Sequence, residues 1–64
     1  MIGYVTKDKD GEVYLHTEEP EYNDTFNAWF AASDMINITN QFPEFDNMSY
    51  TDEPIKVEIK LEKV

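Results

Sequence analysis

The stretch TKDKDGEVYLHT near the N-terminus has the length and part of the pattern of an EF-hand calcium loop. Such a loop places oxygen ligands at its first, third and fifth positions, a glycine at the sixth and a bidentate glutamate at the twelfth. Asp8, Asp10 and Gly11 fit this pattern, but Thr6 and Thr17 stand where the two anchoring carboxylates belong. Because the flanking residues are β-branched and aromatic, we expect a hairpin tip here and no metal site.

A denser run of carboxylates follows this stretch, and two more acids precede the C-terminal segment. The run comprises Glu18, Glu19, Glu21 and Asp24, and the two later acids are Asp52 and Glu53. Carboxylates suit calcium and magnesium, so a small metal-binding module is one hypothesis, with Asp8, Asp10 and Glu12 as a weaker surface site. The other reading is a solvated loop, since acid runs usually serve solubility. Paired carboxylates for glycoside hydrolysis would also need a cleft, which a chain of 64 residues scarcely builds.

His16 is the only histidine, and the chain has no cysteine. A general base needs a partner and a substrate within hydrogen-bond reach. A Ser-His-Asp arrangement would have to recruit Ser33 or Ser49 from irregular segments. We therefore expect a histidine on the sheet surface across from Tyr4, no catalytic residue, no cofactor and no enzymatic activity.

Charge is the strongest compositional signal. The chain has 14 acidic residues, five lysines and no arginine, for a formal net charge of −9. All the lysines lie near the two ends, so the chain between Gly11 and Pro54 carries acids and no cationic side chain. Such a field repels phosphate backbones and anionic membranes, which bind through cationic side chains. We expect no direct nucleic-acid or membrane binding, and a basic protein surface as the partner.

Size and composition predict one small folded domain over residues 1–64. A domain of this size buries only about 60% of the surface that its unfolded chain exposes. A hydrophobic content of 41% and an aromatic content of 14% nevertheless argue against disorder. No apolar run approaches the roughly 20 residues that span a bilayer, and no signal-peptide pattern is present. We expect an unprocessed cytoplasmic protein.

The two ends of the chain show the clearest patterns. Residues 55–62 alternate apolar and charged side chains, which predicts a β-strand that begins after Pro54. The Asp-Lys-Asp-Gly sequence predicts a hairpin loop with a left-handed glycine. In that register Val5 lies opposite Leu15 and Lys7 opposite Val13.

The middle of the chain is ambiguous. Residues 24–33 fit a helix capped by Asn23 or Asp24. They fit equally a strand, FNAWF, then a turn and a second strand, MINIT, with Ile36 and Ile38 inward. The segment NQFPEF predicts an irregular or 3₁₀ turn whose two phenylalanines contact the sheet.

Several short motifs carry a resemblance along most of the chain. They are GYVTKDKDGEVYLHTEEP, the central tryptophan, FPE after an Ile-x-Ile, and DEPIKVEIKLE. This combination resembles short uncharacterised acidic proteins of gut anaerobes and their mobile elements. In those proteins an aromatic residue usually precedes the Asp-Glu-Pro, and here Tyr50 stands two residues before Asp52. The resemblance implies no activity, but it favours strands in the middle segment.

We therefore predict a mainly β protein, with a small α+β fold as the alternative, built from an antiparallel sheet with an N-terminal hairpin and a C-terminal strand. The expected core contains Val5, Val13, Leu15, Trp29, Ile36, Ile38, Phe42, Ile55, Val57, Ile59 and Leu61. The expected function is that of a non-enzymatic acidic interaction protein, in its sharper form an inhibitor that imitates nucleic acid. The binding surface would comprise the six acids of the runs above together with Tyr4 and Tyr14, if these tyrosines are not covered by residues 22–50. An orphan structural domain is the third hypothesis.

Overall fold

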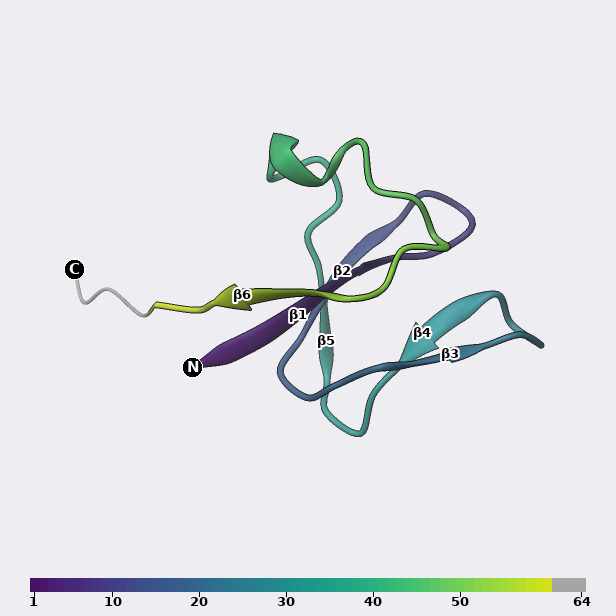
Figure 1. Cartoon of the computed structure of the whole chain (residues 1–64), viewed down its shortest axis with the longest axis horizontal. Helices are drawn as coiled ribbons and strands as arrows, with labels where there is room; N and C mark the ends of the chain where they lie inside the picture. The colour runs from purple at the N-terminus through teal and green to yellow at the C-terminus, as the bar shows by residue number, and fades with distance from the viewer. Residues whose placement is uncertain (61–64) are drawn as a thin grey trace.

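Antiparallel strand pairing organises the chain in the computed structural model, which describes residues 1–60 (Figure 1). The elements are β1 (Ile2–Lys7), β2 (Val13–His16), β3 (Glu21–Asn23), β4 (Ala28–Phe30), β5 (Met35–Asn37), the 3₁₀-helix η1 (Pro43–Phe45) and β6 (Ile55–Glu58). One sheet has the order β5-β2-β1-β6, and β3 pairs with β4 in a separate hairpin. The mainly β fold is thus confirmed. No α-helix occurs in residues 1–60, and the helix alternative for the middle is wrong because β4 lies there.

The first hairpin has the predicted turn and register. The Asp8 amide donates to the Glu12 carbonyl and the Gly11 amide to the Asp8 carbonyl, both at 2.9 Å. Gly11 has a φ of +94°, which a residue without a Cβ adopts at little cost. Val5 lies opposite Leu15, as expected. Strands flank this loop on both sides, so the EF-hand interpretation is wrong.

The C-terminal strand begins directly after Pro54, as predicted, and pairs with β1. Its regular part is shorter than the sequence pattern suggests, although the Ile59 amide still donates to the Met1 carbonyl at 2.7 Å. The predicted core residue Leu61 lies outside the described residues. β1 therefore lies between β2 and β6 as an inner strand of the sheet.

An asparagine turn closes the second hairpin, whose first strand lies in the acid run. The Asn23 side-chain oxygen accepts hydrogen bonds from the amides of Thr25 and Phe26. Asn27 takes a left-handed conformation with a φ of 52°. Asn favours both roles because its short side chain bonds to nearby backbone. The acid run is consequently a solvated loop only in part, since Glu21 belongs to β3.

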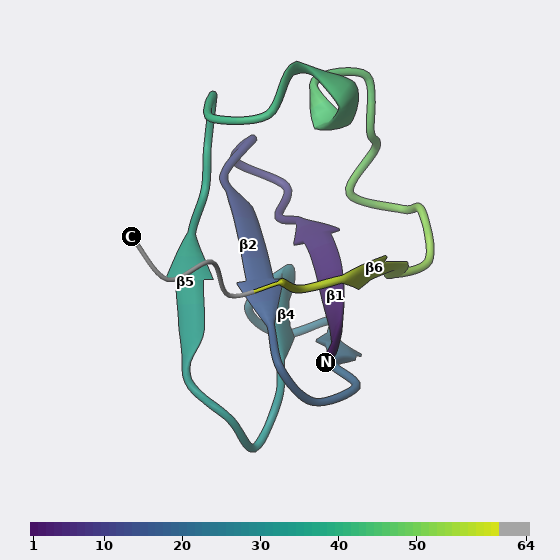
Figure 2. The ribbon, with the colours of Figure 1, turned by 90° about the vertical axis from the view of Figure 1, so that its left-hand side faces the viewer.

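One face of the large sheet carries the apolar core. Val5, Val13, Ile38 and Met48 are buried, and Leu15, Phe45 and Val57 pack against them. The 3₁₀-helix η1 lies beyond one end of the strands (Figure 2). It supplies Phe45, whose ring meets that of Phe42 edge to face.

Three expected core residues are exposed instead. Ile36, Phe42 and Ile55 retain 56%, 46% and 39% of their accessible surface. Ile36 and Ile55 lie on the two outer strands, where a side chain has a neighbouring strand on one side only. Trp29 and Ile59 are half-buried, and Met48 is a core residue that the sequence pattern missed.

The opposite face of the sheet is also covered. Thr6 and His16 have no exposed surface, and the Thr6 hydroxyl lies 2.8 Å from Nε2 of His16. The second hairpin covers this face. A hydrogen bond of 3.1 Å from the Trp29 amide to the Asp8 carboxylate joins it to the first hairpin. The prediction of a surface histidine is therefore wrong, although His16 does lie opposite Tyr4.

Candidate binding site

A groove runs between the large sheet and the second hairpin, with a volume of about 380 Å³. It is lined by Tyr4, Glu19, Pro20, Trp29, Glu53, Pro54 and Lys56. Strand pairing explains how its two acids meet. Tyr4 of β1 lies between His16 at the end of β2 and Lys56 at the start of β6. Glu19 and Glu53, which are far apart in the sequence, are therefore brought to the same part of the surface. We call this feature the Tyr4–Trp29 groove.

A second hollow shares Trp29 and is almost entirely aromatic. This aromatic recess is lined by Tyr22, Trp29, Tyr50 and Thr51 and has a volume of about 300 Å³. The rings of Tyr22 and Trp29 are 5.2 Å apart, with their planes at 67°. The Trp29 indole N–H donates to the Tyr50 carbonyl at 3.3 Å, and the Tyr22 hydroxyl donates to Asn27 at 3.2 Å. The first bond holds the Trp29 ring against the Tyr50 backbone, and the second holds the Tyr22 ring against the turn of its own hairpin.

The surroundings of the aromatic recess are electronegative. Partial burial raises the pKa of Tyr22, and the neighbouring Tyr50 hydroxyl and Asp24 carboxylate raise it further. Burial likewise raises the pKa of Asp8, although the hydrogen bond from Trp29 acts in the opposite direction. The carboxylates of Asp24 and Asp8 thus add negative potential at Tyr22, while burial disfavours the charged forms of both Tyr22 and Asp8.

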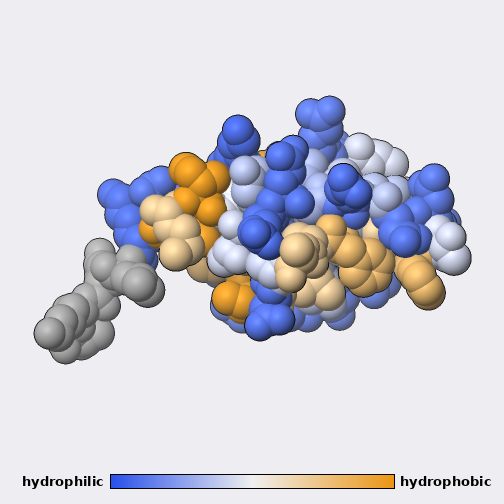
Figure 3. All heavy atoms as spheres, turned by 90° about the horizontal axis from the view of Figure 1, so that it is seen from below, coloured by the Kyte–Doolittle hydropathy of each residue, from blue (hydrophilic) through white to orange (hydrophobic). Residues whose placement is uncertain are grey.

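The acids of the middle segment lack cationic partners. Within residues 1–60, the ion pair that forms joins the N-terminal ammonium to Glu58 at 3.3 Å. No acid between Glu12 and Glu53 forms an ion pair in that part of the chain. Apolar groups also reach the surface between the hydrophilic residues, as Figure 3 shows for one side of the molecule. The exposed surface therefore combines uncompensated negative charge with aromatic area.

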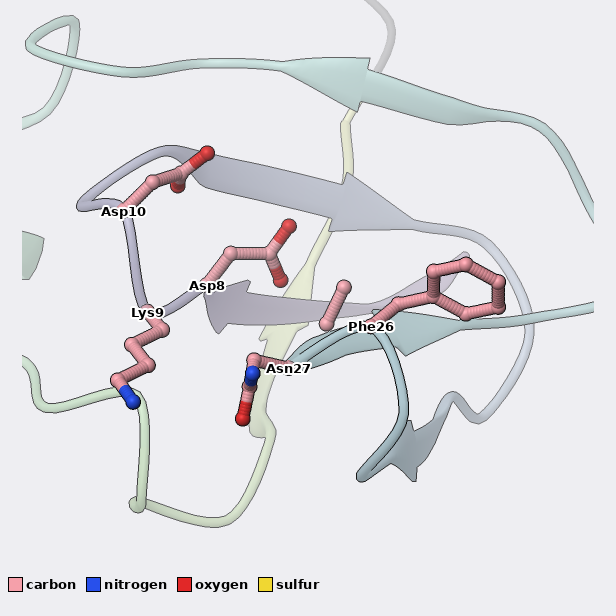
Figure 4. Close-up of a pocket in the computed structure, with 6 residues that line it drawn as sticks. Asp8, Lys9, Asp10, Phe26 and Asn27 are labelled. Carbon is pink, nitrogen blue, oxygen red and sulfur yellow. The ribbon is translucent and has the colours of Figure 1, made fainter.

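The hairpin tip forms a third hollow, against the turn between β3 and β4. In Figure 4 the carboxylates of Asp8 and Asp10 extend to one side of the loop and Lys9 to the other. Each carboxylate of the calcium-like stretch already accepts a hydrogen bond: Asp8 from Trp29, and Asp10 from the Glu12 amide at 2.9 Å.

Glu12 itself is held away from its neighbouring acids. Its carboxylate accepts hydrogen bonds from Thr39 at 2.7 Å and Asn37 at 3.0 Å, and these bonds lower its pKa. Across the described residues, no three His, Asp or Glu side chains converge as metal ligands would. The geometry of this tip thus favours a structural role for its acids.

The residues predicted to bind a partner are only partly brought together. Tyr4, Glu19 and Glu53 line the Tyr4–Trp29 groove, and Asp24 lies near the aromatic recess. Asp52 instead accepts a hydrogen bond from the Ser49 amide and holds a turn.

Three other predicted binding residues lie elsewhere. Tyr14 pairs with Asn37 of β5, while Glu18 and Glu21 are exposed outside the lining of both hollows. Tyr22 and Tyr50 were not predicted as site residues from the sequence. Their aromatic type beside acids was a signal, but only the pairing of β3 with β4 brings Tyr22 opposite Trp29.

The chain is a mainly β protein whose two hollows lie on an acidic and aromatic surface. Comparisons with family models, with curated proteins and with solved structures found no match. In residues 1–60, no helix has the length and apolar character needed to cross a membrane. Function is therefore inferred from the site itself.

Proposed function

We propose that this is a non-enzymatic interaction protein that binds a basic protein partner over the Tyr4–Trp29 groove. The observation that carries the proposal is the uncompensated charge: ten carboxylates and no lysine or arginine between Gly11 and Pro54. The groove adds a surface to this field, because it places two of these carboxylates beside two large aromatic rings, with Lys56 as the one cationic side chain among the described lining residues. A cytoplasmic location and an origin among mobile elements belong to the same proposal.

Charge and aromatic area would contribute differently to binding. Opposite charge steers diffusional encounter and mainly raises the association rate. Tyrosine and tryptophan supply contact area at a low entropic cost, and this slows dissociation. If the natural target of the partner is a nucleic acid, the same acids would occupy the place of phosphates and the protein would act as an inhibitor.

The test begins with capture of the partner from the native host and its identification by mass spectrometry. Stopped-flow association with that purified partner is then measured between 0.05 and 1 M salt, over which the Debye length falls from more than about 10 Å to about 3 Å. We expect the association rate to fall steeply with salt. The double variant E19Q/E53Q should lower the association rate more than it raises the dissociation rate.

A matched control is the double variant D34N/D46N, which removes the same charge from exposed positions outside the groove. It should change association less than the groove variant does. An acidic partner would refute the proposal. So would an association rate that ignores both salt and the E19Q/E53Q substitutions.

A further inference from the structure

We propose that the aromatic recess holds the ammonium end of a lysine side chain supplied by the basic partner. This assignment rests on the proposed function, because it names the group of that partner that enters the surface. Tyr22, Trp29 and Tyr50 provide three ring systems around one hollow of about 300 Å³. Aromatic rings attract cations electrostatically through their negative faces, and aromatic cages recognise methylated ammonium groups in this way.

The geometry favours an ammonium over a guanidinium. The planes of Tyr22 and Trp29 meet at 67°, so the rings form a corner and not a pair of parallel walls. A flat guanidinium stacks best on one face or between parallel faces, whereas a rounded ammonium contacts differently oriented rings at once.

The lining also predicts how methylation would change binding. Among residues 1–60 no carboxylate lines the recess, and the Tyr50 carbonyl is already occupied by the Trp29 indole N–H. An unmodified ammonium has three N–H donors, for which the lining residues offer hydroxyl oxygens and no carboxylate, so it would lose part of its hydration here. A trimethylated ammonium keeps its charge and has no donors, so we expect binding to strengthen with methylation.

The chain itself contains a lysine ammonium close to one of these three rings. Nζ of Lys9 lies 6.0 Å from the centroid of the Tyr50 ring, at the limit of a cation–π interaction. Lys9 extends from the first hairpin and is not part of the recess lining. It nevertheless places a positive charge beside the site, so its removal should strengthen binding of an incoming cation.

The experiment uses the full chain and three short, otherwise neutral peptides. They carry a central lysine, a trimethyl-lysine, or the neutral carbon isostere of trimethyl-lysine. Trp29 is the only tryptophan, so its fluorescence and the NMR signal of its indole N–H report directly on the recess. We expect the trimethyl-lysine peptide to bind about tenfold more tightly than the isostere, within the about 2- to 30-fold that a cation–π contact provides, and the lysine peptide to lie between them.

Ring variants separate the recess from the general acidic field, because they leave every charge in place. Tyr22→Leu and Tyr50→Leu should each remove most of the preference for the trimethyl-lysine peptide, and Tyr50→Phe should retain it. Phe26→Leu is the matched control, since Phe26 is 69% exposed and lies outside the recess lining. Lys9→Gln should increase affinity about twofold or more.

Equal binding of the charged peptide and the isostere would overturn the assignment, as would tighter binding of an arginine peptide. If Tyr50→Leu does not fold, an indole N–H signal of the wild-type chain that is unmoved by the trimethyl-lysine peptide would also overturn it. The two proposals fail separately. If the ring variants leave peptide binding unchanged while association with the partner still slows with salt, only the lysine assignment is wrong. If the association rate with the partner does not depend on salt, the proposed function is wrong.

Discussion

Replacing Thr6 by valine should destabilise the protein strongly although it barely changes side-chain shape. The Thr6 hydroxyl lies 2.8 Å from Nε2 of His16, and both residues are fully buried. The other ring nitrogen of His16, Nδ1, is buried and has no hydrogen-bond partner among the residues that the structure describes. After the substitution neither nitrogen of the imidazole would have a partner.

The expected cost follows from the burial of this pair. A buried polar group left without its partner costs about 1–3 kcal/mol. A 64-residue domain has a total stability of about 3–10 kcal/mol at typical values per residue. For a domain of this size each kcal/mol corresponds to about 4–8 °C in Tm, so Thr6→Val should lower Tm by about 5–20 °C.

Urea and thermal unfolding, followed by Trp29 fluorescence and far-UV circular dichroism, measure this loss. Thr6→Ser keeps the hydroxyl and serves as the control for the lost methyl group. The double variant Thr6→Val with His16→Leu removes both polar partners and should recover much of the loss, because paired apolar replacement is nearly neutral. A Thr6→Val protein as stable as the wild type, or a double variant less stable than Thr6→Val alone, would refute the reasoning.

Two further predictions concern the turn and the buried histidine. Gly11→Ala should cost about 1 kcal/mol in unfolding free energy through backbone strain alone, since the added Cβ meets nothing within 4 Å; Gly11→Asn should cost less, and equal costs would contradict this. Burial lowers the pKa of His16, against the opposing effect of Asp8, so its stabilising contribution is complete above about pH 6.5 and is lost as pH falls toward the folded-state pKa. The difference in unfolding free energy between the wild type and His16→Gln should therefore decrease as pH is lowered from 7.5 to 5, by at most about 1.4 kcal/mol per pH unit. A difference that stays constant over this range would contradict the lowered pKa of His16.

Local signals predicted the two ends of the fold, left residues 24–33 open between a helix and a strand, and missed β3. The Asp-x-Asp-Gly turn sets the register of β1 and β2 without help from distant residues, and Pro54 marks the start of β6. β3 has three residues and an acid-rich neighbourhood, so neither periodicity nor hydrophobicity distinguishes it from a loop. β3 forms through its pairing with β4, and the sequence of β3 alone does not show that pairing.

The site depends on the same pairing. Without β3 in place, nothing in the sequence shows that the hairpin covers His16 or that Tyr22 lies opposite Trp29. Tyr4, Glu19 and Glu53 were predicted as binding residues from their types alone. Their common position follows from the strand order around β1, which alternating hydrophobicity does not determine.

The inner position of β1 also determines when the chain can fold during its synthesis. β1 is synthesised before the other strands, but one of its two neighbours is β6, so the pairing of Ile2 with Glu58 must wait for almost the whole described chain. Closing so long a loop costs entropy before any contact compensates for it, and folding dominated by such pairings is slow. Until then one edge of β1 has unpaired backbone groups, a template for pairing with other nascent chains. The mutual repulsion of the acids between β2 and β6 would keep neighbouring nascent chains apart during this interval.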